Sequence, residues 1–185
     1  MLKGKISSDS GATLVLALVF FLLCAVAGSI ILIAGSGAAG RMADLKDDQQ
    51  AYYSVTSAAK LFEDQMAGQK YLISSGGSVS ARVADGHKDG ALQVLLREGL
   101  ASAHDSKNYT VKDCKLRCQG DSKLDVTFDF IMNEGYYVTI LVKRQGTGED
   151  KVQYQCTLKA RATTKTNSNN SVNIDWNKDS ITVSK

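Results

Sequence analysis

The sequence predicts an α+β protein in which one long N-terminal helix packs on a C-terminal antiparallel β-meander. Three observations support this fold class: an uncharged apolar run from Ala12 to Ala34, apolar residues at helical spacing as far as Met66, and alternating residues after Tyr109. A chain with 44% hydrophobic and 22% charged residues has the composition of a globular protein. Its net charge of +3 gives no reason to expect a nucleic-acid partner.

The apolar run is long enough to cross a membrane as a helix. Residues 12–34 would extend roughly 35 Å, against about 30 Å for the hydrocarbon core. A cleaved signal peptide is the alternative, but its apolar region would be shorter, and "GSGAAGR" only weakly imitates a cleavage site. Lys3 and Lys5 precede the run and favour a cytoplasmic N-terminus. We therefore expect a single-pass protein of the cytoplasmic (inner) membrane with an extracytoplasmic domain over residues 68–185.

The helical pattern continues beyond the apolar run. Apolar residues recur every seven positions, and charged residues occupy the other side of the helix. The chain contains no proline, and the first strong helix breakers are Gly68 and the "SSGGS" of residues 74–78. We expect one helix over residues 12–67, with its transmembrane half over 12–34 and a second half that packs on a sheet. The packing stripe comprises Leu45, Tyr52, Val55, Ala59, Phe62 and Met66.

Three amphipathic strands follow in the C-terminal part. The segments "LDVTFDFIM", "YYVTILVKR" and "VQYQCTLKA" alternate apolar and polar residues, and "NEG" and "GTGED" form turns between them. Such a meander has one wet face, which includes Asp125, Thr127 and Asp129, and one apolar face that needs a cover. The apolar face comprises Leu124, Val126, Phe128, Phe130, Met132, Tyr136, Val138, Ile140, Val142, Val152, Tyr154, Cys156, Leu158 and Ala160.

The remaining segments are shorter. Residues 91–103 predict a helix whose inner face carries Leu92, Leu95, Leu96 and Leu100. The segment "TVKDCKLRC" is a candidate first strand of the meander. "SVNID" and "SITVS" would either extend the sheet or form a hairpin, and residues 163–171 are expected to be an exposed loop. "DGHKDG" at residues 85–90 is typical of a solvated turn.

The order of these parts resembles a known family. A basic polar leader ends in a glycine, and an apolar half-helix, an amphipathic half-helix and a C-terminal domain follow. This arrangement resembles type IV prepilins and the pseudopilins of related secretion systems, and "SGATLVLALVFFLL" carries most of the resemblance. The resemblance implies a leader of residues 1–11, cleavage by prepilin peptidase between Gly11 and Ala12, and N-methylation of Ala12. It also implies assembly with other pilin or pseudopilin subunits through a retained helix that includes Thr13, Leu14, Leu16 and Gly28.

One position departs from the family pattern. Most pilins have a glutamate five residues into the mature chain, thought to neutralise the N-terminal amine of a neighbouring subunit, whereas this chain has Leu16 there. The departure resembles minor pilins and pseudopilins at a filament tip, and it also fits a protein that never enters a filament. Two hypotheses therefore stay open: a minor structural subunit of a type IV pilus or pseudopilus, and a single-pass anchor whose external domain binds a partner or the cell wall.

The cysteines give no single pairing. Cys24 lies in the apolar run, which leaves Cys114, Cys118 and Cys156 outside it, and an extracytoplasmic domain favours one disulfide. If Cys114 lies on the first strand of the meander, Cys156 is roughly 14 Å away, although a disulfide needs Cα atoms within about 7 Å. A displaced strand, a turn between Cys114 and Cys118, and fully reduced thiols all remain open.

Catalytic motifs are not apparent. The sequence has no phosphate-binding loop, nucleophile elbow or zinc-protease helix, and its cysteines and two histidines lack metal-ligand spacing. We expect a non-enzymatic protein without a cofactor or a metal. An anchored hydrolase or redox enzyme is a third alternative, to which only the odd external cysteine points.

Overall fold

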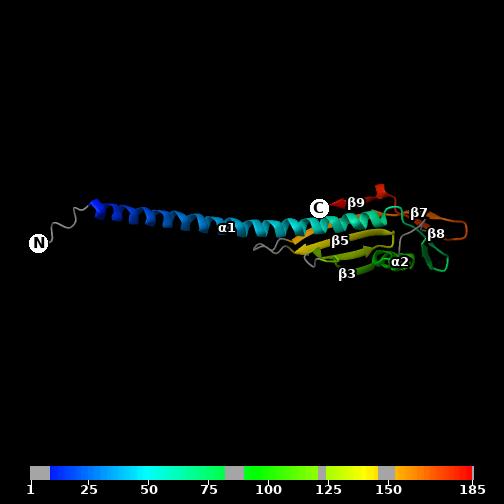
Figure 1. Cartoon of the computed structure of the whole chain (residues 1–185). Coiled ribbons are helices and arrows are strands. Elements are labelled where there is room, and N and C mark those ends of the chain that lie inside the picture. The colour runs from blue at the N-terminus through cyan, green and yellow to red at the C-terminus, as the bar shows by residue number, and fades with distance from the viewer. Residues whose placement is uncertain (1–8, 82–89, 121–123, 146–152, 185) are drawn as a thin grey trace. The chain divides into compact units, whose positions relative to one another are not determined.

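The computed structural model describes residues 9–81, 90–120, 124–145 and 153–184. The chain divides into two compact units, residues 1–46 and 47–185. A long N-terminal helix is followed by antiparallel sheets, so the predicted α+β class is confirmed (Figure 1). The expected turn at residues 146–150, and residues 85–89 of the other expected turn, lie outside the described residues.

The first helix, α1, extends over Asp9–Met66 and so begins slightly before the expected Ala12. No proline lies nearby to stop it. The other elements are β1 (Lys70–Ile73), β2 (Val79–Ala81), α2 (Ala91–His104), β3 (Tyr109–Leu116), β4 (Val126–Met132), β5 (Tyr137–Gln145), β6 (Gln153–Arg161), β7 (Thr163–Thr166), β8 (Val172–Asp175), η2 (Lys178–Ser180) and β9 (Ile181–Ser184).

The larger sheet has the antiparallel strand order β3-β4-β5-β6-β9. The predicted meander of β4, β5 and β6 is confirmed, and β3 and β9 extend it at its two edges. Phe130 lies opposite Ile140, which in turn lies opposite Leu158. All three side chains are fully buried, so the even-numbered positions form the apolar face.

The C-terminal part of α1 covers this apolar face (Figure 1). The rings of Phe62 and Phe128 lie 4.9 Å apart between centroids, and those of Tyr52 and Tyr154 lie 6.2 Å apart. A polar contact adds to the packing, because Arg144 Nη1 donates a hydrogen bond of 2.9 Å to Ser54 Oγ. Helix and sheet therefore share one core, which includes Val55, Ala58, Ala59, Phe62 and Met66 of α1.

The second helix, α2, joins the same core through Leu92, Leu96 and Leu100, while Leu95 is half-buried. Its close approach to β4 depends on Gly99, where a Cβ atom would lie 3.0 Å from Met132 Cε. Next to Gly99 in the chain, Glu98 accepts a hydrogen bond at its Oε2 from the Tyr109 hydroxyl, which ties β3 to α2. Burial and this hydrogen bond raise the pKa of Tyr109 to about 12.

A second sheet, with the order β2-β1-β8-β7, was not predicted. It corrects one expectation, because residues 163–166 form strand β7 rather than loop. Of the two alternatives for the last strands, "SITVS" extends the larger sheet as β9, whereas "SVNID" forms β8 of the second sheet. The chain turns from α1 into β1 at Gly68, whose φ of +79° is the left-handed conformation that glycine permits. The Gly68 N–H then donates to the carbonyl of Trp176, just beyond β8, at 2.8 Å.

The outer face of the larger sheet is less exposed to solvent than expected, because Asp129 on this face is buried. Its Oδ2 accepts a hydrogen bond of 2.7 Å from Lys143 Nζ on β5, and its Oδ1 accepts one of 2.9 Å from the backbone N–H of Asp113 on β3. The Lys143 hydrogen bond, followed by that of Asp113, lowers the pKa of the Asp129 carboxyl. A carboxylate on the outer face thus links three neighbouring strands.

We predict that Phe62→Ala lowers the free energy of unfolding by about 3–5 kcal/mol, because the cavity lies between helix and sheet. Urea unfolding of the full chain in detergent micelles can be followed by fluorescence of Trp176, the single tryptophan and fully buried. Leu61→Ala is the control, since Leu61 is 45% exposed and should cost about 1 kcal/mol or less. Equal losses in both variants would contradict the packing described.

We predict that Asp129→Asn lowers the free energy of unfolding by about 1–3 kcal/mol at pH 7. Because the folded-state pKa of Asp129 is lowered, its stabilisation is present above the unfolded-state pKa and is lost as the pH falls through the folded-state value. Unfolding measured from neutral to acid pH should therefore decline less steeply in Asp129→Asn than in the wild type. Asp105→Asn, at an exposed aspartate, should retain the wild-type slope.

Candidate functional site

The N-terminal part of α1 is apolar and uncovered. Among the described side chains of residues 16–33 the large hydrophobic ones are all at least half exposed. Among the described residues, α1 is the one helix that is both long enough and apolar enough to cross a membrane. The mean hydropathy of its most apolar 18-residue stretch is 3.0. These exposed side chains are Leu16, Leu18, Val19, Phe20, Phe21, Leu22, Leu23, Val26, Ile30, Ile31, Leu32 and Ile33.

The residues expected to take part in processing lie in the same helix. Gly11, Ala12, Thr13 and Leu14 have helical backbone, and their side chains lie outside the described set. Leu16, at the position where most pilins have glutamate, is 75% exposed. At Gly28 an added Cβ would meet no heavy atom within 4 Å. This helix therefore offers an apolar surface without a packing partner in the described part of its own unit.

The predicted packing stripe is buried except at its first residue. Val55, Ala59, Phe62 and Met66 are buried in the core and Tyr52 is half-buried, whereas Leu45 is 62% exposed. Including Leu45 was wrong, because the heptad spacing continues along the helix before its first buried position, Ala51. Periodicity alone marks a face of the helix and not the length over which that face is covered.

The structure separates the cysteines that were considered for a disulfide. Cys114 lies opposite Phe128, Phe128 opposite Val142, and Val142 opposite Cys156, so the two cysteines share one row three strands apart. That separation is roughly 14 Å, beyond the reach of about 7 Å that a disulfide allows. The strand carrying Cys114 is not displaced toward β6, and all four cysteines are free thiols. Cys156 instead donates a hydrogen bond of 3.3 Å to the Ser184 carbonyl.

An apolar groove of about 490 Å³ lies between α1, α2 and β3. Leu61 of α1 and Val94 of α2 are 45% and 47% exposed on its walls, and Phe62 and Leu92 line its buried side. Leu95, Cys114, Lys115 and Leu116 also line the groove. Sequence analysis missed it because Leu61 lies off the predicted stripe and Val94 off the inner face of α2, so each was an unremarked apolar residue on a polar side of its helix.

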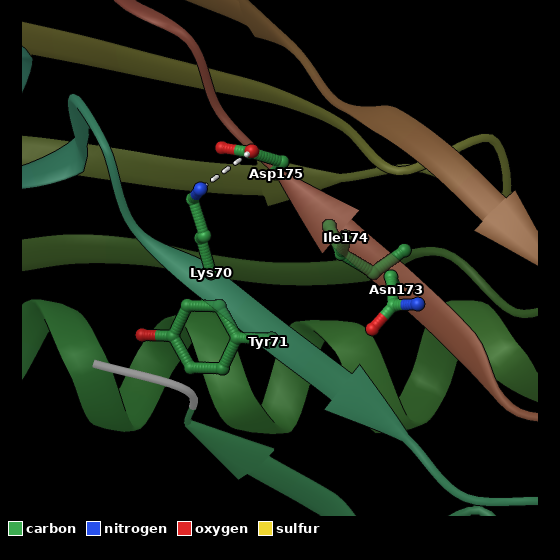
Figure 2. Close-up of a pocket in the computed structure, with 5 residues that line it drawn as sticks. All are labelled: Lys70, Tyr71, Asn173, Ile174 and Asp175. Atoms are coloured by element: carbon green, nitrogen blue, oxygen red, sulfur yellow. Dashed lines mark ion pairs between the residues drawn. The ribbon is translucent and has the colours of Figure 1, made fainter. Parts of the chain in front are cut away.

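A smaller hollow of about 360 Å³ lies on the second sheet (Figure 2). Its lining residues are Lys70 and Tyr71 of β1 with Asn173, Ile174 and Asp175 of β8. Figure 2 shows the ion pair between Lys70 Nζ and Asp175 Oδ2, which are 3.5 Å apart. The two charges neutralise each other, and the lining residues include no cysteine, serine or histidine that could act as a nucleophile or base. The hollow is therefore a poor candidate for an active site.

The described residues contain no further cluster of side chains that suggests a catalytic or metal site. There, no three His, Cys, Asp or Glu side chains lie close enough together to hold a metal ion. His104 is the last residue of α2, and His87 falls outside the described residues. Comparison of the chain with protein-family models, curated proteins and solved structures gives no match.

We predict that the three external thiols react at different rates with a maleimide at pH 8. Cys118 is exposed and should react first, whereas Cys156 is buried and should react only on unfolding. Cys114 should be intermediate, because burial, followed by the charges of Asp129 and Asp113, raises the pKa of its thiol and reduces the reactive thiolate. Timed labelling with peptide mass spectrometry measures the order. A disulfide between any two of the three would contradict it.

Proposed function

We propose that the chain is a structural subunit, and a minor one, of a type IV pilus or a related secretion pseudopilus. In this role prepilin peptidase removes residues 1–11 and the retained helix from Ala12 onward assembles with other subunits. The observation that carries the proposal is the division of α1 into two kinds of surface. Its N-terminal part exposes large apolar side chains such as Leu16 and Ile31, while its C-terminal part is buried at Val55 and Phe62.

The mechanism is physical rather than catalytic. In the membrane the exposed apolar part of α1 contacts lipid, with the N-terminus inside and the residue 68–185 domain outside the cell membrane. On assembly the helix leaves the bilayer, and packing against equivalent helices replaces the lost lipid contacts. Small residues such as Ala17, Ala25 and Gly28 allow close approach between helices, and an added Cβ at Gly28 meets nothing within one chain.

Leu16 favours a minor subunit and also supports a second candidate function. Leucine has no carboxylate with which to neutralise the N-terminal amine of a neighbouring subunit. This suits a subunit at the filament tip, because no subunit lies above it there. The same exposed leucine suits an uncleaved single-pass anchor whose external domain binds a partner or the cell wall. The two functions differ in whether the bond between Gly11 and Ala12 is cut.

We predict that the protein purified from membranes of its own organism begins at N-methylated Ala12. Mass spectrometry of the N-terminal peptide measures this directly. The mass of the intact protein should be lower than that of the full chain by the mass of residues 1–11, apart from the added methyl group. Gly11→Leu should block the cut, because a bulky side chain replaces the small residue at the scissile bond. Gly4→Leu, elsewhere in the leader, should leave it unchanged. An intact leader in the wild type would exclude the pilin role and favour the anchored domain.

A further inference from the structure

The outer face of the larger sheet carries a basic hollow, on the opposite side from the helix-covered core. The hollow has a volume of about 240 Å³ and spans β5, β6 and the start of β9. Lys159 and Arg161 of β6 lie in its middle, with Tyr137 and Thr139 of β5 beside them. Its other lining residues are Val138, Ala160, Ser180 and Thr182, so the described lining includes two cations and no acidic residue.

Strand register places the two cations next to each other on one face. Tyr137 lies opposite Arg161, and Lys159 lies between Thr139 of β5 and Thr182 of β9. Because Lys159 and Arg161 are two residues apart on one strand, they share a face and their Cα atoms are about 7 Å apart. Both residues are exposed. One anionic group placed between them can therefore contact both side chains.

Neither cation is neutralised by a carboxylate of its own chain. Among the described residues, no Asp or Glu oxygen lies within 4.0 Å of the charged nitrogens of Lys159 or Arg161. Asp179 of η2, beside the lining residue Ser180, is exposed and forms no ion pair with them, and Lys178 precedes it. Like charges on neighbouring positions repel each other, and a bound anion relieves that repulsion.

The ring of Tyr137 positions the guanidinium of Arg161. The Arg161 Cζ lies 5.4 Å from the ring centroid, which is a cation–π contact. A guanidinium stacked in this way keeps the N–H groups at its edge free to form paired hydrogen bonds with two oxygens of a carboxylate or phosphate. An arginine that is already oriented also loses less side-chain freedom when an anion binds.

The lining gives little support to an apolar or aromatic ligand. Val138 and Ala160 are only 1% and 2% exposed, so the hollow offers almost no apolar surface to a lipid chain or a hydrophobic peptide. Arg161 lies over one face of the Tyr137 ring and reduces the stacking surface that a nucleobase would use. The ligand that fits this hollow is therefore anionic and otherwise polar.

Hydroxyl groups on the β9 side of the hollow suit a sugar. Ser180 Oγ donates a hydrogen bond of 2.7 Å to the Asn177 carbonyl, and Thr182 Oγ1 donates one of 3.4 Å to the Lys159 carbonyl. Each hydroxyl oxygen uses its hydrogen in this way and keeps lone pairs with which to accept. Sugar hydroxyls are donors that match these acceptors, in the same hollow as the two cations.

We propose that this hollow binds the acidic group of an anionic polysaccharide, a carboxylate or a phosphate carried on a sugar. Arg161 pairs with two oxygens of that group, Lys159 contacts it from the neighbouring position, and Ser180 and Thr182 accept hydrogen bonds from adjacent sugar hydroxyls. The volume is below the range of about 300–1,000 Å³ that encloses a drug-sized ligand, which suits contact with a single sugar of a longer chain. This binding activity goes beyond the structural role proposed above and does not depend on whether the leader is cut.

Calorimetric titration of the full chain in nonionic detergent micelles tests the site. The probes are oligogalacturonate, which carries carboxylates, phosphomannan, which carries phosphates, and neutral dextran. At least one acidic glycan should bind and dextran should not, and comparison of the two acidic glycans identifies the acidic group. Binding of neither acidic glycan overturns the proposal, as does equal binding of dextran. Tighter binding of an oligothymidylate than of both acidic glycans overturns the sugar ligand in favour of a nucleic acid.

A pair of charge-matched variants tests whether binding is local. Lys159→Gln together with Arg161→Gln should raise the Kd for the acidic glycan about tenfold or more at low salt, because both cations are lost. Lys112→Gln together with Lys115→Gln removes the same charge from exposed positions on β3 and should change the Kd by less than about twofold. Equal losses in the two double variants would show attraction to net charge alone and would overturn the site.

Tyr137→Leu tests the positioning of Arg161 separately from its charge. This variant keeps both cations and should raise the Kd several-fold without changing the salt dependence of binding, because the number of ion pairs is the same. An unchanged Kd would overturn the positioning role of the ring. Fluorescence of the buried Trp176 shows whether each variant is folded, and the exposure of Lys159 and Arg161 makes their replacement compatible with the fold.

Discussion

The fold of the C-terminal unit depends on covering one apolar sheet face. In the five-stranded sheet the inward positions of β4, β5 and β6 are mostly apolar, and a single sheet cannot bury them by itself. The last turns of α1 supply the cover, and the contact of Phe62 with Phe128 lies at its centre. The α1 side chains that cover the sheet are buried and therefore cannot contact another protein. The polar outer face of the sheet and the exposed remainder of α1 follow from this division.

Periodicity predicted most of this arrangement. Alternation in residues 124–132 identified β4, and seven-residue spacing identified the covered face of α1 at Val55, Phe62 and Met66. It failed where the pattern is short or polar. Strand β7 is four exposed residues, Thr163–Thr166, whose pairing with β8 gives no hydrophobic signal. Burial of Asp129 was equally hidden, because its partners Lys143 and Asp113 come from neighbouring strands whose register no local pattern fixes.

Register also explains why sequence left the cysteines undecided. Spacing along the chain does not reveal which strands neighbour each other, and a displaced first strand would have brought Cys114 close to Cys156. The observed pairing of β3 with β4 instead keeps two intervening strands between them. The groove escaped notice for a related reason. Leu61, Val94 and Leu116 come from three separate elements, and each is an ordinary surface residue until the fold brings them together.

One edge of the larger sheet is unfavourable for pairing with the strands of other chains. Strand β3 is an edge strand, and an unprotected edge would pair with strands of other chains. Its register is broken by a bulge between Val111 and Cys114, where Asp113 adopts a φ of +54°. Exposed Lys112 lies within the bulge beside the exposed Asp113, and exposed Lys115 follows it, so charged side chains line this edge. Edge-to-edge pairing at β3 is therefore opposed by the bulge and by the cost of burying these charged side chains. The apolar surfaces that remain free among the described residues belong chiefly to α1 and to the groove beside it.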